Sequence, residues 1–401
     1  MEISQISQLA KKMVNRFRGL SLTFGSRQTP KEFDEIFLHE SSSKPSSQPN
    51  PKPRKLSTGK PTTPLQTPSE IQPELKICLI GCGGAGKSTI FRQCETLFGD
   101  GYSEKVLSNY TPFVQQSLVE KLKALFEFVL NECSMDRKIV DKNTELKMKL
   151  FLEKHKSEQF IGDKILDPQA WVDILNNDEV KGILANLHQH PAINSSIGNC
   201  IEFYIEDYSR LTTINYTALE TDYIKFQQKT TGIVQHKFTY KNTPFLLMDV
   251  GGQRNERKKW INALSVCNAL VYVVSLSEFD EICMEDEKTN RLVEDFATFQ
   301  EWSKNDLVKE KMVYLLFTNT DRFQKKIRDS KRLEVIRNIF PEHDISDDVR
   351  DLDAVIFSRI VEEFSERDYN NRIAGMFKTN VLDCNELRSA MSSMLDMMIN
   401  K

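Results

Sequence analysis

A short apolar run that leads into a glycine-rich loop constrains the fold of this chain more than any other feature. The run covers residues 75–80, and its length and unbroken apolar character are typical of a buried strand in a parallel sheet. Four glycines follow within residues 81–86, and apolar residues at helical spacing begin at residue 88. A strand that passes through a glycine-rich loop into a helix predicts a doubly wound α/β fold.

The loop at residues 81–88 reads GCGGAGKS and fits the pattern GxxxxGK(S/T). Glycines let backbone N–H groups approach phosphate oxygens closely, and the N-terminus of the following helix favours negative charge. Lys87 would reach the β- and γ-phosphates, and the Ser88 hydroxyl would bind Mg²⁺. We therefore expect a nucleoside triphosphate to bind at Gly81, Cys82, Gly83, Gly84, Ala85, Gly86, Lys87, Ser88 and Thr89.

A second motif, DVGGQ at residues 249–253, ends another apolar run. Asp249 suits coordination of Mg²⁺ through water, Gly252 leaves its N–H free for the γ-phosphate, and Gln253 can orient an attacking water. Upstream, KTTG at residues 229–232 precedes a predicted strand, and Thr230 can supply a second hydroxyl to the metal. The predicted metal ligands are Ser88, Thr230 and, through water, Asp249.

Apolar spacing predicts how the rest of the chain is organised. Expected strands cover residues 233–240, 244–249, 270–275 and 311–318, with a three-residue hairpin connection at 241–243. Expected helices cover residues 253–264, 288–302, 330–339, 353–366 and 384–398. Residues 102–222 show only helical spacing, at 110–130, 146–159, 171–187 and 201–211. Seven of the 14 prolines fall within residues 41–70, which predicts a disordered linker behind a basic amphipathic helix at 1–20.

Composition excludes several classes of protein. The net charge of −3 implies no attraction to nucleic acid, so we expect no nucleic-acid partner. No apolar run approaches the roughly 18 residues that a membrane span needs, so we expect no transmembrane segment. The eight cysteines show no CxxC or metal-ligand spacing, which indicates reduced thiols and a cytoplasmic location.

These motifs together resemble those of the α-subunit of heterotrimeric G proteins. The resemblance rests on GKSTIFRQ at 86–93, KTTGIV at 229–234, DVGGQRNERKKW at 249–260 and EDEKTNRL at 285–292. It implies a Ras-like GTPase domain with an inserted all-α domain. The expected division is an N-terminal helix and tail at 1–40, a Ser/Pro-rich linker at 41–74, a GTPase domain at 75–101 and 223–401, and a helical insert at 102–222.

The resemblance also implies ligands, roles and partners. The ligands would be GTP or GDP with Mg²⁺, in a GTPase reaction in which Gln253 positions the hydrolytic water. Residues 254–260 would form a second switch that faces a βγ dimer or an effector, and residues 285–291 would form a third switch. Further nucleotide contacts would come from Ile224, Lys225, Phe226, Gln228, Lys229, Val250, Gly251, Asn319, Thr320 and Asp321. Peripheral attachment at the inner face of the plasma membrane is an alternative to a purely cytoplasmic location.

The chain departs from the family at two positions near the phosphates. The family carries a catalytic arginine three residues before the threonine equivalent to Thr230, and this chain has Gln227 there. An arginine at that point contributes on the order of 10³ to 10⁵ in rate, or roughly 4–7 kcal/mol of barrier. The family's phosphate loop usually has Glu-Ser where this chain has Gly84 and Ala85, so both halves of a latch across the nucleotide are absent together.

Other departures affect the base site and the termini. The guanine motif NKxD is reduced to Asn319-Thr320-Asp321, with spacing that is one residue shorter, and the family's TCAT loop reads KTNV at 378–381. The start lacks Met-Gly, so we expect no N-myristoylation. The end at Lys401 is short of the usual receptor-contacting tail, which argues against receptor coupling.

Three functions are compatible with this pattern. The first is a divergent Gα-like switch in transmembrane signalling with slow GTP hydrolysis and fast exchange. The second is a scaffold that binds βγ or an effector without turnover, because base affinity is lost. The third is a P-loop ATPase or kinase, in which adenine fits where the guanine motif is altered.

Overall fold

The computed structural model describes residues 73–133, 140–155, 173–185, 201–213, 215–343, 345 and 351–401. The predicted N-terminal helix and tail at 1–40, and all but the last two residues of the predicted linker at 41–74, lie outside these ranges. Within the described ranges, no helix is both long enough and apolar enough to cross a membrane.

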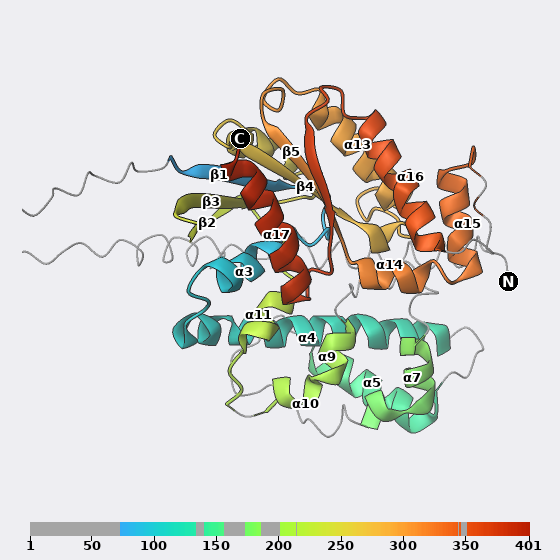
Figure 1. The fold of residues 1–401 in the computed structure, drawn as a ribbon. Coiled ribbons are helices and arrows are strands. Elements are labelled where there is room, and N and C mark those ends of the chain that lie inside the picture. Colours follow the sequence, from blue (N-terminus) through green and yellow to red (C-terminus); the bar gives the residue numbers. More distant parts are fainter. Residues whose placement is uncertain are drawn as a thin grey trace, which may run out of the picture.

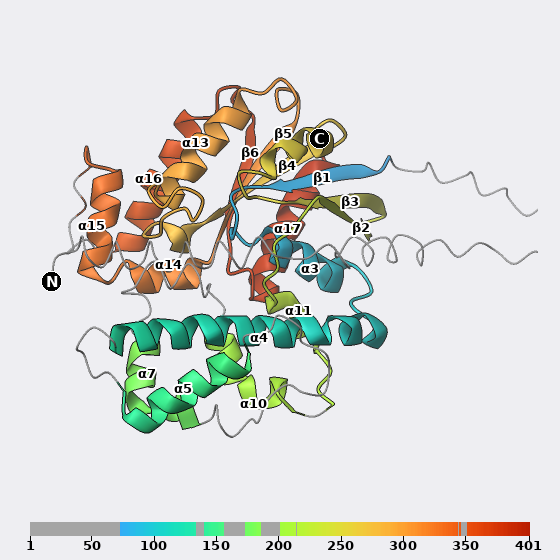
Figure 2. The ribbon, with the colours of Figure 1, turned by 180° about the vertical axis from the view of Figure 1, so that it is seen from behind.

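A six-stranded sheet forms the centre of the larger part of the molecule (Figures 1 and 2). Its spatial order is β2-β3-β1-β4-β5-β6, and only β2 is antiparallel to its neighbour. The strands are β1 Leu75–Ile80, β2 Ile233–Tyr240, β3 Thr243–Val250, β4 Ala269–Ser275, β5 Met312–Thr318 and β6 Ile373–Lys378. This mixed, mostly parallel sheet with helices on both faces confirms the predicted fold class.

Each central strand buries side chains on both faces, which explains its unbroken apolar run. On β1, Ile77 and Leu79 pack with α3 (Lys87–Phe98) and α17 (Cys384–Ile399), whereas Cys78 and Ile80 belong to the core on the opposite face. That second face is covered by α12 Trp260–Leu264, α13 Arg291–Ser303, α14 Thr320–Lys326, α15 Ser330–Ile339 and α16 Leu352–Glu366.

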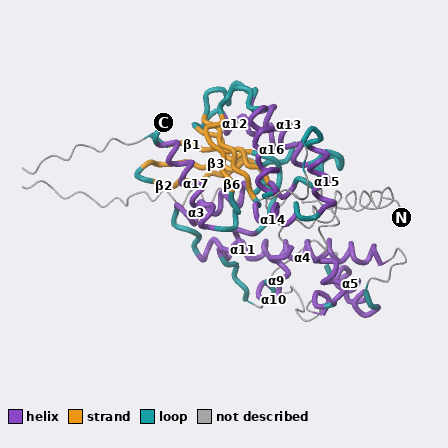
Figure 3. The backbone as a smooth tube through the Cα atoms, turned by 45° about the vertical axis from the view of Figure 1, so that its right-hand side comes forward, coloured by secondary structure: helices purple, strands orange, loops and turns teal. Residues whose placement is uncertain are grey.

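A separate set of helices lies beside the sheet domain, along its lower edge in Figure 1. The long helix α4 runs across this layer, and Figure 3 shows the same helices as a body of their own. They are α4 Glu104–Cys133, α5 Lys142–Lys154, α7 Asp178–Ala185, α9 Ile201–Glu206, α10 Tyr208–Leu211 and α11 Glu220–Lys225. They enclose their own hydrophobic core, which includes Phe126, Phe151 and Tyr204.

The chain enters and leaves this helical body at one place. Thr96 Oγ1, near the end of α3, donates to Glu220 Oε1 at 2.6 Å, at the start of α11. The rings of Tyr102 and Tyr223 meet edge to face with their centroids 4.7 Å apart. Two segments separated by more than a hundred residues therefore lie side by side at this junction.

Several predicted boundaries shift for local reasons. The hairpin turn has two residues, not three, because Lys241 and Asn242 both adopt positive φ and Thr243 already pairs with Tyr240. The helix expected at 288–302 begins at Arg291, because the Asn290 side chain caps it by accepting from two backbone N–H groups. The helix expected at 253–264 begins with a turn at 253–256 and a 3₁₀ segment, Arg257–Lys259.

Among the strands and α-helices of the described ranges, β6, α11 and α14 were not predicted. Strand β6 lies at the edge of the sheet and is only half buried, so its apolar residues form no continuous run. Helices α11 and α14 are six and seven residues long, too short for a periodic pattern. Much of the predicted 146–159 and 171–187 helices is described, and the remainder lies outside the described ranges.

Candidate functional site

The phosphate loop passes close to the sheet with backbone geometry that favours glycine. Gly81 has φ 140° and Gly84 has φ 85°, both in the region that L-residues rarely adopt. A Cβ atom at Gly81 would lie 2.2 Å from the Val273 carbonyl oxygen of β4, so the loop can leave β1 only with glycine there. The loop ends at Gly86, which caps the N-terminus of α3.

Lys87 lies buried inside this loop. Its Nζ donates to the carbonyl oxygens of Gly81 and Cys82, at 2.9 and 2.7 Å. Burial lowers the pKa of Lys87, and the carboxylate of Asp249 opposes that shift. The ammonium group therefore lies at the place where contacts to the β- and γ-phosphates are predicted. The two backbone oxygens that bind it are uncharged, so its positive charge stays available to a phosphate.

The three predicted metal ligands lie together at the start of α3. Ser88 Oγ is 2.7 Å from Thr230 Oγ1 and donates to Asp249 Oδ2 at 2.6 Å. Within the described residues, the other carboxylate oxygen of Asp249 is buried and has no hydrogen-bond partner. Burial raises the pKa of Asp249, while the positive charge of Lys87 lowers it. Two hydroxyls and a carboxylate with an unpaired buried oxygen fit the hard, oxygen-rich environment that Mg²⁺ prefers.

Gln253 and the second switch pack against the loop. A Cβ atom at Gly83 would lie 3.3 Å from Gln253 Cγ, so the predicted water-positioning side chain lies directly beside the loop. The fully buried Trp260 donates from Nε1 to the Gly251 carbonyl at 2.7 Å, and Arg257 donates from Nε to the Gly252 carbonyl at 3.2 Å. These bonds tie the DVGG backbone to the residues that follow it, and Arg257 also donates from Nη2 to Cys82 Sγ of the phosphate loop at 3.2 Å.

Charged contacts that were not predicted join the expected second switch, 254–260, to Glu294 of α13 and to Asp286 of the expected third switch. Arg254 forms a bidentate pair with Glu294 at 2.7 and 2.8 Å, and Arg257 contacts the same carboxylate at 2.8 Å. Arg254 also pairs with Asp286 at 2.8 Å. The separation of Arg254 from Glu294 along the chain, 40 residues, gave no sequence signal.

The segment that leads to Thr230 is held at its beginning and exposed at its centre. Arg92 of α3 donates to the carbonyl oxygens of Tyr223 and Phe226, and Phe226 packs into the helical core. Gln227, where the resemblance implies a catalytic arginine, is exposed. Lys225, an expected nucleotide contact, is the last residue of helix α11, and its Nζ lies over the Phe203 ring at 4.4 Å.

Asp222 fixes the same segment from within the helical body. Its carboxylate is fully buried and accepts two hydrogen bonds from Arg210 at 2.7 Å, one from the Tyr216 hydroxyl at 2.6 Å and one from the Leu219 N–H at 2.9 Å. Although burial raises the pKa of Asp222, the hydrogen bonds from Arg210 and Tyr216 hold it below its usual value. Among the predicted contacts of this segment, Ile224 is buried, and Gln228 and Lys229 are exposed.

The residues that were predicted to contact the nucleotide base follow the carboxyl end of β5. Asn319 follows β5 with φ 57° and donates from Nδ2 to Ser275 Oγ at 2.8 Å, and Thr320 and Asp321 begin α14. The residue that joins this region to the phosphate loop is Thr318, whose Oγ1 donates to the Ala85 carbonyl at 2.8 Å. The sequence analysis missed Thr318, although its place at the carboxyl end of a parallel strand is a usable signal.

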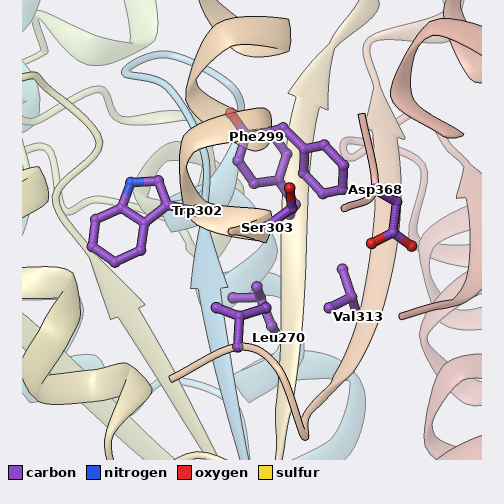
Figure 4. A pocket seen from close by; sticks show the side chains of 8 residues that line it. Leu270, Phe299, Trp302, Ser303, Val313 and Asp368 are labelled. Carbon is purple, nitrogen blue, oxygen red and sulfur yellow. The ribbon is translucent and has the colours of Figure 1, made fainter. Parts of the chain in front are cut away.

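Asp321 lines an open cavity of about 680 Å³ together with the loop that follows β6. Asn380 of that loop donates its backbone N–H to Glu386 Oε2 at 2.8 Å. A second, enclosed cavity of about 10 Å³ lies between α13 and strands β4 and β5 (Figure 4). It is lined by Leu270, Tyr272, Phe299, Trp302, Ser303, Val308, Val313 and Asp368. At that volume it holds at most one water, so it is not a ligand site.

An unpredicted ion pair lies beside Gly83 and Gly84 of the phosphate loop. Arg291, the first residue of α13, pairs with Glu278 at 2.6 Å and donates from Nη2 to the Gly83 carbonyl. Burial raises the pKa of Glu278 to about 7, and the positive charge of Arg291 opposes that shift. A Cβ atom at Gly84 would lie 2.8 Å from Nη2 of Arg291.

Comparisons with known proteins agree with this geometry. The chain is 30% identical over 289 residues to the guanine nucleotide-binding protein G(o) subunit alpha of Caenorhabditis elegans, covering 71% of this chain and 77% of that protein. It is 31% identical over 273 residues to the guanine nucleotide-binding protein alpha-2 subunit of Glycine max, covering 63% and 67%. The family model described as G-protein alpha subunit matches residues 54–398, and this chain therefore belongs to the G-protein alpha subunit family.

Proposed function

We propose that this chain is a switch in signal transduction that binds GTP with Mg²⁺ and hydrolyses it slowly. Its family makes it a guanine-nucleotide-binding signalling subunit. The observation that supports the Mg²⁺ part best is the buried, unpaired oxygen of Asp249 beside the hydroxyls of Ser88 and Thr230. Mg²⁺ would neutralise charge on the β- and γ-phosphates, and Lys87 would exchange its two backbone carbonyls for phosphate oxygens.

The slow hydrolysis follows from the residue at position 227. Gln227 is exposed and uncharged, so it cannot neutralise charge that develops on the γ-phosphate as an arginine does. Gln253 remains beside Gly83, where it can orient the attacking water. We therefore expect turnover that is far below that of a chain with arginine at position 227.

Nucleotide exchange is expected to be fast. The latch across the nucleotide is absent because position 84 is glycine and position 227 is glutamine. At the base site, the Asn380 N–H is already bonded to Glu386, so a base must compete with a carboxylate for that donor. Both features reduce the number of contacts that must break for release.

The proposed organisation follows from the same comparison. The GTPase domain comprises residues 75–101 and 223–401, and the helical insert comprises residues 102–222. The second switch, 254–260, is the proposed face for a βγ dimer or an effector, because the exposed Lys258 and the half-buried Lys259 lie beside Trp260, which binds the DVGG backbone.

Single-turnover GTP hydrolysis by the wild type and by Gln227→Arg tests the proposal, with mass spectrometry of the nucleotide that co-purifies. We expect guanine nucleotide in the preparation and a hydrolysis rate that rises by at least about 10²-fold in the variant. A wild-type rate equal to that of Gln227→Arg would refute slow hydrolysis. Absence of binding to GTP, GDP and GTPγS by calorimetry would refute the switch itself and leave a scaffold.

A further inference from the structure

The Arg291 side chain occupies the space that a side chain at position 84 would need. A Cβ atom at Gly84 would lie 2.8 Å from Arg291 Nη2 and 3.0 Å from Glu278 Oε1. The glutamate that the family usually has in the loop would have to displace Arg291 and Glu278 from these positions. With glycine at position 84, the arginine of α13 can lie against the phosphate loop.

Arg291 and Gln253 converge on the same loop residue. Arg291 donates to the carbonyl oxygen of Gly83, and a Cβ atom on Gly83 would be 3.3 Å from Gln253 Cγ. The side chain proposed to orient water and a permanent positive charge thus flank one glycine of the loop that binds phosphate. Positive charge is most effective in catalysis where it is already in position before negative charge develops.

The guanidinium of Arg291 also retains a donor for a ligand. Its Nε is bonded to Glu278 and its Nη2 to Gly83, whereas Nη1 forms no hydrogen bond in the described part of the chain. The side chain is 14% exposed, so its charge is only weakly screened by water. The Glu278 carboxylate, 6% exposed, holds the guanidinium in place and competes for its charge.

We propose that Arg291 donates a hydrogen bond to the γ-phosphate during hydrolysis and supplies positive charge that Gln227 cannot. The proposal rests on the proposed GTPase function. In that reaction the water oxygen bonds to the γ-phosphorus, and the bond from the γ-phosphorus to the bridging oxygen breaks. The bridging oxygen keeps the electron pair as part of GDP, and the proton from water leaves with inorganic phosphate. Arg291 forms no covalent bond and stabilises charge on the transferred group.

Three variants separate this role from a purely structural ion pair. Arg291→Gln removes the charge, Glu278→Gln removes the competing carboxylate and keeps Arg291, and Arg291→Lys keeps the charge without the planar fork. Arg332→Gln is the matched control, because Arg332 is a buried arginine that pairs with Asp280 at 3.1 Å without contacting the loop. Thermal unfolding of each variant reports how much each pair contributes to folding.

Two measurements decide the outcome. Single-turnover hydrolysis should fall about 10²-fold in Arg291→Gln, partly recover in Arg291→Lys, and stay equal or rise in Glu278→Gln and Arg332→Gln. The affinity for GDP with aluminium fluoride, which mimics the transferring phosphoryl group, should fall by a similar factor in Arg291→Gln. The affinity for GTPγS should stay within about threefold of the wild type, because the contact strengthens only as charge develops.

Other results would overturn the assignment. Equal losses in Arg291→Gln and Glu278→Gln that follow their thermal stability would make the pair structural. An unchanged rate in Arg291→Gln, or a wild type that binds GTP and hydrolyses none, would remove Arg291 from the reaction. If Arg291→Gln does not fold, Arg291→Lys decides, because a hydrolysis rate and an affinity for GDP with aluminium fluoride that both equal those of the wild type would overturn the assignment. Failure of the wild type to bind GTPγS would refute the proposed function instead.

Discussion

Gly252 is the position at which the smallest side chain should have the largest effect on switching. A Cβ atom there would lie 2.3 Å from Lys87 Nζ, 2.4 Å from the Gly81 carbonyl oxygen and 2.8 Å from the Cys82 carbonyl carbon. Lys87 can move, but the two backbone atoms cannot, because Gly81 is itself packed against the Val273 carbonyl of β4. Gly252→Ala must therefore push the second switch away from the phosphate loop.

The size of the effect follows from these distances. Cβ atoms essentially never approach other heavy atoms within 3.0 Å, so the alanine must move by more than half an ångström against two fixed atoms. Overpacking of this kind costs about 3 kcal/mol. If the cost applies only when the second switch is docked, the docked population falls by about 10²-fold relative to the undocked one.

Limited proteolysis after Arg254, Arg257, Lys258 and Lys259 measures that population. The wild type should become resistant on addition of GTPγS and Mg²⁺, and Gly252→Ala should stay sensitive at the same nucleotide occupancy. Gly83→Ala is the control, because the one tight contact of its Cβ would be with the flexible Gln253 side chain, at 3.3 Å, and the Gln253 backbone would lie at ordinary van der Waals distance, 3.8 Å or more. Full GTPγS protection of Gly252→Ala would show that the docked arrangement described here is not the one that nucleotide stabilises.

Three further predictions concern single charged residues. Lys87→Ala should weaken GTPγS affinity by about 10²-fold in equilibrium titrations, because charge-assisted phosphate bonds are lost. Asp222→Ala should lower the free energy of unfolding by about 2–4 kcal/mol in urea titrations, because it leaves Arg210 and Tyr216 without their buried acceptor. Asp207→Ala is the control: it removes a more exposed partner of Arg210 and should lower the free energy of unfolding by less than about 1 kcal/mol. Burial raises the pKa of Glu278 to about 7, so its contribution to stability is complete below about pH 4.5 and is lost as pH rises through 7; denaturation between pH 5 and 8 should show a shallower decline in Glu278→Gln.

The parts of the fold that sequence patterns predicted are those buried on both sides. The central strands were located to within about a residue because continuous apolar runs bounded by Gly81 or Asn319 have few alternatives. Strand β6 was missed because Gly375 interrupts its apolar pattern and the edge position leaves it half buried. Short helices such as α11 form because neighbouring residues hold them, which a local pattern cannot show.

In the candidate site, too, some residues could be predicted from the sequence and others could not. Residues within the motifs, such as Lys87 and Asp249, were identifiable because each motif requires a residue type at a fixed spacing. Arg291 could not be identified as a site residue from the sequence. Its contact with Gly83 joins segments 208 residues apart, and it depends on the absence of a side chain at Gly84. Such a contact is a property of the folded arrangement of two loops, and single-sequence patterns contain no signal for it.

The junction between the two bodies has a consequence for how this chain is built. Because Thr96 contacts Glu220 and Tyr102 contacts Tyr223, the helical body is inserted between two points that are already neighbours. The entropic cost of closing a loop grows only with the logarithm of its length, so an insert of this length between two neighbouring points adds little to the cost of folding the six-stranded sheet. The chain is thus modular, and a short glycine-serine bridge from residue 102 to residue 223 should leave the six-stranded sheet able to fold by itself.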